Sequence, residues 1–171
     1  SVGPNSTGND FGFAPKRGQL INDLKFGILP TNGKSASFWK KQLQVAVSGK
    51  GTAEIPVDSL IVYVAKMRGL LLTDPFTLPG GNGLQAALDL LSRPVKTDLD
   101  QLVRELLAAE FNHVSGRGII STDPELQLFL IGWGETLVNN LGGITAFAAG
   151  TTSSTTEDAI YIFTHLNSSV G

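Results

Sequence analysis

The stretch DLDQLVRELLAAEFNHVSGRG, residues 98–118, decides the fold class of this chain. Its apolar residues recur every three or four positions, the spacing that places side chains on one face of an α-helix. Thr97 or Asp98 is the expected N-cap, because a side-chain oxygen there accepts a hydrogen bond from a free backbone N–H, and Gly116 is the expected stop. The stretch therefore predicts a long amphipathic helix packed on a hydrophobic core.

Glu110 falls near the centre of the apolar face of this helix, and His113 falls near its edge. On a helical wheel, Arg104, Glu105 and Asn112 point away from that face. An ionised carboxylate buried without partners is very costly, so Glu110 is expected to be hydrogen-bonded, paired with a cation, protonated or exposed. The favoured interpretation is a structural anchor to a neighbouring helix or loop. The alternative is a carboxylate in a pocket, acting as an acid, a base or a ligand contact.

The same periodicity predicts further helices, and a strand is an alternative only where β-branched residues gather, in residues 57–72. The expected helical segments are SASFWKKQLQVAVSG (35–49), VDSLIVYVAKMRGLLL (57–72), GLQAALDLLSRP (83–94), PELQLFLIGWGETLVNNLGG (124–143) and TEDAIYIFTHLNSSVG (156–171). The expected N-caps are Ser37 for the first segment, Asp58 or Ser59 for the second, Asp123 for the fourth, and Thr155 or Thr156 for the fifth. Gly49 is the expected stop of the first segment, and Pro124 is placed at the first helical position of the fourth.

Residues 1–34 are rich in Gly, Pro and Asn, which predicts an extended arm or linker with little helix. The island QLINDLKFGIL (19–29) is apolar enough to dock on a core through Leu20, Ile21, Leu24, Phe26 and Ile28. The predicted fold is all-α: one bundle of about six helices over residues 35–171, preceded by the arm of residues 1–34.

Composition narrows the function classes. The chain has 171 residues, of which 42% are hydrophobic, so it can bury the core of one domain. The net charge is −2 and no cationic cluster is present, which argues against a nucleic-acid binder. No apolar run approaches the ~20 residues of a membrane span. Cysteine is absent, which excludes disulfides and thiolate chemistry. The charged fraction of only 16% is typical of secreted bacterial proteins.

No catalytic motif and no cofactor are predicted. The two histidines, His113 and His165, do not form an H-E-x-x-H constellation, so a zinc site is not expected, whereas a calcium site completed by loop carbonyls stays open. Trp39 and Trp133 are large enough to stack on sugar rings, although aromatic residues at helical spacing more often belong to a core. The candidate ligand-binding residues are therefore Trp39, Trp133, Glu110 and His113.

Four short motifs occur in a suggestive order. They are SFWKKQ (37–42), ALDLLSRP (87–94), LLAAEFNHVSG (106–116) and FTHLNSSVG (163–171). In this order the chain resembles a module of secreted and surface-anchored bacterial proteins that opens with GYWKN, reaches an LLAAxLN…G helix and ends near LDxYNNG. Lys41 and Gln42 replace the usual Asn and His after the Trp-Lys pair, and Leu166 precedes Asn167 where Tyr or Phe is usual. The resemblance implies export and a non-catalytic accessory role, and it names no ligand.

The expected function is a non-catalytic binding, adhesion or structural module, extracellular or at the cell surface, that recognises a surface polymer, a glycan or a partner protein. Two alternatives stay open. In one, the N-terminal arm of one copy docks on the next and builds a homo-oligomer. In the other, the chain is a hydrolase that uses Glu110.

Overall fold

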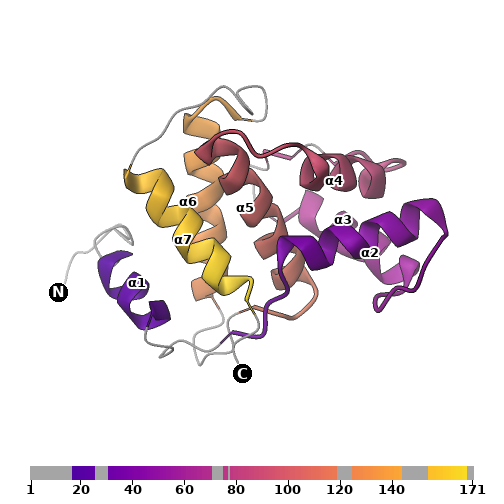
Figure 1. Cartoon of the computed structure of the whole chain (residues 1–171), viewed down its shortest axis with the longest axis horizontal. Helices are drawn as coiled ribbons and strands as arrows, with labels where there is room; N and C mark the ends of the chain where they lie inside the picture. Colours follow the sequence, from indigo (N-terminus) through magenta and orange to yellow (C-terminus); the bar gives the residue numbers. More distant parts are fainter. Residues whose placement is uncertain are drawn as a thin grey trace.

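The computed structural model describes residues 17–25, 31–70, 75–76, 78–118, 125–143 and 154–168, and within these ranges it contains seven α-helices and no extended strand. The helices are α1 (Arg17–Lys25), α2 (Ala36–Ser48), α3 (Val57–Arg68), α4 (Gly83–Ser92), α5 (Asp98–Val114), α6 (Leu126–Asn140) and α7 (Ser154–Leu166). They pack into a single bundle (Figure 1). The all-α prediction is therefore confirmed, and residues 57–72 do not form the alternative strand where they are described.

Helix α5 lies at the centre of the bundle and contacts α2, α3, α4, α6 and α7. Thr97 caps it as predicted: its side chain accepts from the backbone N–H of Asp100, and the Asp100 carboxylate accepts in return from the N–H of Thr97. This reciprocal capping satisfies donors that a helix start leaves free. The helical-wheel prediction that Glu105 and Asn112 point away from the core was, however, wrong. Glu105 and Asn112 are buried, because α7 covers that side of the helix.

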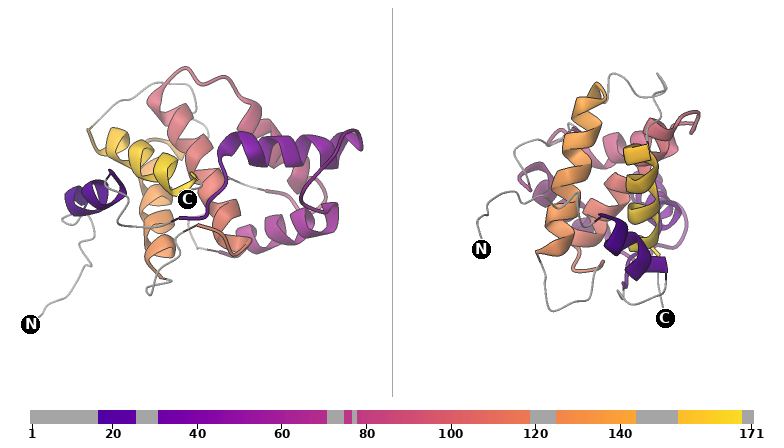
Figure 2. Two further views of the ribbon diagram at one scale, coloured as in Figure 1. Left: turned by 60° about the horizontal axis from the view of Figure 1, so that its bottom comes forward. Right: turned by 90° about the vertical axis from the view of Figure 1, so that its left-hand side faces the viewer.

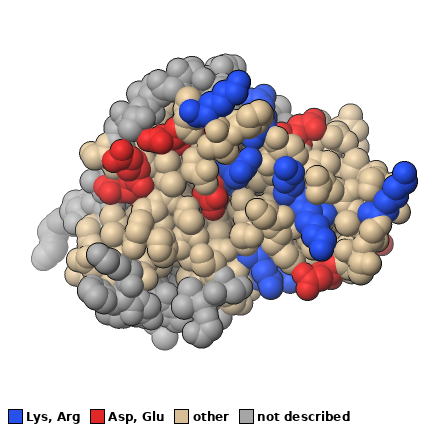
Figure 3. Space-filling model, viewed as in Figure 1, with Lys and Arg blue, Asp and Glu red and all other residues tan. Residues whose placement is uncertain are grey.

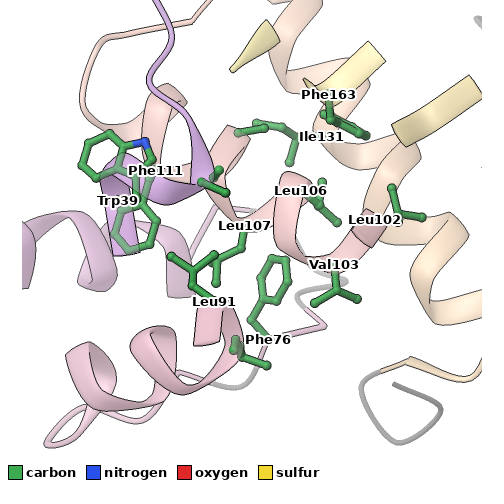
Figure 4. Packing of buried hydrophobic residues seen from close by; sticks show 14 of the residues in the cluster. Trp39, Phe76, Leu91, Leu102, Val103, Leu106, Leu107, Phe111, Ile131 and Phe163 are labelled. Atoms are coloured by element: carbon green, nitrogen blue, oxygen red, sulfur yellow. The ribbon is translucent and has the colours of Figure 1, made fainter. Parts of the chain in front are cut away.

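The hydrophobic core surrounds α5 on several sides, and Figure 4 shows side chains of α2, α4, α6 and α7 meeting those of α5. The labelled core residues are Trp39, Phe76, Leu91, Leu102, Val103, Leu106, Leu107, Phe111, Ile131 and Phe163. Gly134 lets α6 approach closely, since a Cβ atom there would stand 2.7 Å from the Phe163 ring and 2.8 Å from Leu106. The fit of this small residue is part of what fixes α6 against α5 and α7.

The helix starts differ from the sequence prediction at several points. Ser35, not Ser37, is the N-cap of α2, while Gly49 ends that helix in the left-handed conformation, as predicted, with φ 68°. Pro56 takes the N-cap position of α3, without a side-chain cap. Helix α7 begins earlier than expected, at Ser154. The expected cap at Asp123 and first position at Pro124 lie outside the described residues.

The N-terminal segment was predicted to be extended, but Arg17–Lys25 form the short helix α1, which packs against α7 (Figure 1, Figure 2). Leu20 and Leu24 are buried there, so the apolar island does dock on the core. Its other members Phe26 and Ile28 lie outside the described residues. A nine-residue helix is marginal on its own, and we attribute its helicity to this packing.

Residues 31–34 pack against the segments that follow α5 and α7 rather than forming part of a free arm. The backbone N–H of Asn32 donates to the carbonyl of Gly118 at 2.8 Å, and the Thr31 hydroxyl donates to the carbonyl of Ser168. At Gly33 a Cβ atom would stand 2.1 Å from the Leu166 carbonyl oxygen, so only glycine fits this crossing. This crossing fastens the chain ahead of α2 to the end of α7. In the part of the chain that is described, no helix is long and apolar enough to cross a membrane.

Candidate functional site

Asn112 is the centre of a buried hydrogen-bond network on the α7 side of α5. Its Oδ1 accepts from the backbone N–H of Lys34 at 2.8 Å and from the indole Nε1 of Trp39 at 3.0 Å. Its Nδ2 donates to the carbonyl of Lys34 at 2.9 Å and to Oδ1 of Asn167 at 2.8 Å. One amide therefore holds together α5, the entry to α2, and the end of α7.

The network continues through Asn167 to Glu105. The Asn167 Nδ2 donates to the backbone carbonyl of Glu105 at 2.8 Å and to its Oε1 at 3.0 Å, while Gln101 Nε2 donates to Glu105 Oε2 at 2.9 Å. Burial raises the pKa of Glu105 above its ordinary value, and the hydrogen bond from Asn167, the charge of Arg104 and the hydrogen bond from Gln101 offset part of that increase. We call Trp39, Glu105, Asn112 and Asn167 the polar clasp.

The polar clasp brings together one residue from each of three sequence motifs. Trp39 belongs to SFWKKQ, Asn112 to LLAAEFNHVSG and Asn167 to FTHLNSSVG, and the three are joined by direct hydrogen bonds. These side chains are buried, and their polar atoms are engaged with one another and with the backbone. The geometry therefore indicates that these motif positions hold the fold together, which makes them poor candidates for contact with a ligand.

The two tryptophans proposed as ligand contacts pack inside the bundle. Trp39 has no exposed surface and stacks on Phe111 with ring centroids 5.0 Å apart, and the Arg117 guanidinium lies 5.6 Å from the Trp39 ring. Trp133 is half-buried and packs near Phe163, with centroids 6.4 Å apart. Packing in the core, the alternative to ligand stacking, therefore explains the whole Trp39 ring and the buried part of the Trp133 ring.

Glu110 and His113 are also held at packed surfaces of α5. Glu110 has no exposed surface, and Glu135 on the neighbouring helix α6 is likewise fully buried. His113 is half-buried, with its Nδ1 3.4 Å from Oε1 of Gln127 on α6. None of the four candidate ligand-binding residues lines the groove described next.

A groove of about 490 Å³ opens between α2, α3 and the start of α4, and it was not predicted from the sequence. Ile61 of α3 and Val47 of α2 line it while 51% and 40% exposed, and Val64 forms a buried part of its wall. The remaining lining residues are Ala65, Arg68, Gly80, Gly81, Asn82, Gly83, Leu84 and Gln85. The one sequence signal for it was the glycine-rich turn LPGGNG (78–83), which alone has no specific meaning.

The charge around the groove is positive. Arg68 is the only charged residue among the described residues that line it, and Gln85 is held by a 2.7 Å hydrogen bond to Asp89. The segments that carry α2, α3 and α4, residues 36–70 and 78–92, contain five Lys or Arg against three Asp or Glu. Figure 3 shows Lys and Arg side chains spread over the half of this face that holds α2, with some Asp and Glu side chains among them, and further Asp and Glu side chains near the start of α7.

Metal-binding chemistry has little support in the described ranges, where no three His, Asp or Glu side chains gather closely enough to hold an ion. His165 lies on α7 with its Nδ1 2.8 Å from the carbonyl of Tyr161. No protein-family model matches the sequence, and comparisons with curated proteins and with solved structures found no match either. The resemblance to the bacterial surface module stays a prediction that rests on the four motifs.

Proposed function

We propose that this chain is a non-catalytic module that binds a partner protein in the groove between α2, α3 and α4. The observation that carries the proposal is the open aliphatic surface of that groove, where Ile61 and Val47 remain exposed beside Arg68. Its volume of about 490 Å³ falls in the range of binding clefts. The buried centre of a protein interface is more apolar than the rest of the surface, and arginine is enriched in interfaces.

A protein partner fits this groove better than a glycan does. Sugar rings are commonly held by stacking on aromatic side chains, and no aromatic residue is among the described residues that line the groove. The same lining supports a binding role over a catalytic one. Among the described lining residues Arg68 is the only one with an ionisable side chain, whereas acid–base catalysis needs a group that exchanges protons near neutral pH.

We place this module outside the cell or at the cell surface. The support is a charged fraction of 16% and a motif order that resembles exported bacterial modules. The hydrolase alternative gains no support, since Glu110 is fully buried and does not line the groove.

A selection of short peptides displayed on phage against the immobilised protein tests the proposal. The deciding comparison is between Ile61→Ser and Val62→Ser, because these neighbours on α3 are 51% and 49% exposed and only Ile61 lines the groove. We expect the selected peptides to lose binding to Ile61→Ser and keep binding to Val62→Ser. Equal retention by both variants would remove the groove as the site. A parallel glycan array with Trp133→Ala would detect a polysaccharide ligand instead.

Self-assembly through the N-terminal segment is a second candidate, because α1 packs on α7 through two buried leucines, Leu20 and Leu24. The same contact can form between two copies when this segment exchanges, which is a low-cost route to a dimer. Light scattering over a range of protein concentrations tests it. A dimer that Leu24→Asp returns to a monomer supports exchange, and a monomer at every concentration refutes it.

A further inference from the structure

We propose that the occupant of the groove is an acidic segment of the partner protein, in which an aliphatic side chain enters the groove and a carboxylate meets Arg68. This inference rests on the proposed function and adds the chemistry of the partner to it. It follows from three features of the groove: where it is apolar, where it is charged, and how closely another backbone can approach it.

The apolar part of the groove lies on α2 and α3. Val47 and Ile61 leave 40% and 51% of their surface in water, and Val64 and Leu84 continue the same wall toward α4. An aliphatic side chain from a partner removes this surface from water, which is the main driving force for association. A fully polar acidic segment would leave it exposed.

The charged part lies at the end of α3, where the lining residue Arg68 is exposed. One of its guanidinium nitrogens stands 3.9 Å from where a Cβ atom of Gly80 would be, so the cation lies beside the turn that leads into α4. No described acidic residue lines the groove, and Asp89, one helical turn beyond Gln85, holds the amide of Gln85. Arginine pairs well with carboxylates, because its planar guanidinium can donate two parallel hydrogen bonds.

The wider surface favours the same sign of partner. The segments that carry the groove, residues 36–70 and 78–92, hold five basic side chains (Lys40, Lys41, Lys50, Lys66 and Arg68) against three acidic ones (Glu54, Asp58 and Asp89). Such an excess attracts an acidic segment over several ångströms and speeds its association at low salt. It favours a segment with several carboxylates over a single terminal carboxylate. The start of α4 adds a smaller positive contribution, since a helix begins at the positive end of its dipole.

The glycine-rich turn gives a partner backbone room to approach. A Cβ atom at Gly81 would have no atom within 4 Å, so the backbone of the turn lies open on that side. An extended segment can therefore lie along the turn with alternate side chains pointing into the groove and toward solvent.

The test uses capped peptides of about eight residues, which rise about 3.3 Å per residue when extended. In the first peptide leucine and glutamate alternate; in the second lysine replaces glutamate; in the third serine replaces leucine. Fluorescence anisotropy at low ionic strength measures their binding to the whole chain. We expect the leucine–glutamate peptide to bind most tightly, and added salt to weaken it.

Matched variants locate the contact. Arg68→Glu should weaken the leucine–glutamate peptide about tenfold, whereas Lys66→Glu, the same charge change on the same helix outside the lining, should weaken it only about twofold. Ile61→Ser should weaken it and Val62→Ser should not. Circular dichroism of each variant verifies that the helices are intact.

The outcomes separate this inference from the proposed function. If Ile61-dependent binding selects uncharged or basic peptides, or if Arg68→Glu and Lys66→Glu have equal effects, the acidic partner is wrong and the groove remains a binding site. If no peptide in the displayed library binds in a way that depends on Ile61, both fail.

Discussion

Replacing Asn112 with alanine is expected to lower the free energy of unfolding by about 3–5 kcal/mol. The substitution removes both donors and the shared acceptor of a fully buried amide that makes four hydrogen bonds. Lys34 is only partly buried, so water can replace the bonds to its backbone. The indole N–H of Trp39 and Oδ1 of Asn167 are buried and lose their partner, at about 1–3 kcal/mol each. A small cavity adds to this cost.

Urea unfolding followed by circular dichroism measures this loss, and two further variants make it interpretable. Trp39→Phe removes the indole donor and also part of a fully buried ring, so it should cost at least about 1–2 kcal/mol even though Asn112 Oδ1 keeps its bond to the Lys34 N–H. Gln101→Ala removes the half-exposed end of the network and should cost less than about 1 kcal/mol. If Asn112→Ala costs no more than Gln101→Ala, the polar clasp does not stabilise the fold and the reasoning is refuted.

Three further predictions follow from the described contacts. The pKa of Glu105 is raised in the folded state, so its contribution to stability is fully present below the ordinary value of 4.5 and is lost as the pH rises through the raised pKa. Over that pH window, the free energy of unfolding of the wild type should fall relative to that of Glu105→Gln. A constant difference between the two proteins in denaturation at each pH would contradict this. Gly134→Ala should cost about 1–3 kcal/mol by overpacking against Phe163, whereas Gly18→Ala on α1, where a Cβ meets nothing within 4 Å, should be neutral or stabilising; thermal melts compare the two. Thr97→Ala should cost about 1 kcal/mol by removing the α5 cap, and an unchanged melting temperature would contradict the capping assignment.

The helical architecture could be predicted because the spacing of apolar residues within each segment indicates which face of the helix is apolar. The α5 segment gave its period, its Thr97 cap and its end near Gly116 within a short stretch of sequence. The polar side of the same helix could not be interpreted in this way. Asn112 meets Lys34 and Asn167, which are 78 and 55 positions away, and no pattern local to α5 indicates that α7 and the entry to α2 cover that side.

The candidate site was predicted less well, for a related reason. Trp39 was proposed for a ligand because of its size, and its place in the core depends on Phe111 and Asn112 from another helix. The groove exists because packing leaves an apolar residue uncovered, where for Trp39 packing covers one. Ile61 reads as one apolar residue of an amphipathic helix, and only the packed bundle shows that α2, α3 and the turn before α4 leave it half uncovered. Sites assembled from several helices give little signal in any single one of them.

The crossing at Gly33 has a mechanical consequence. Because Thr31 bonds to Ser168 and Gly33 lies against Leu166, the segment that leads into α2 and the segment that follows α7 are neighbours. A tension applied between residues 31 and 168 would load this crossing first and would reach the packed helices only after it had opened. Helices α2 to α7 can therefore be carried within a longer chain as a closed loop. When that chain is pulled, the crossing opens before the helices unfold.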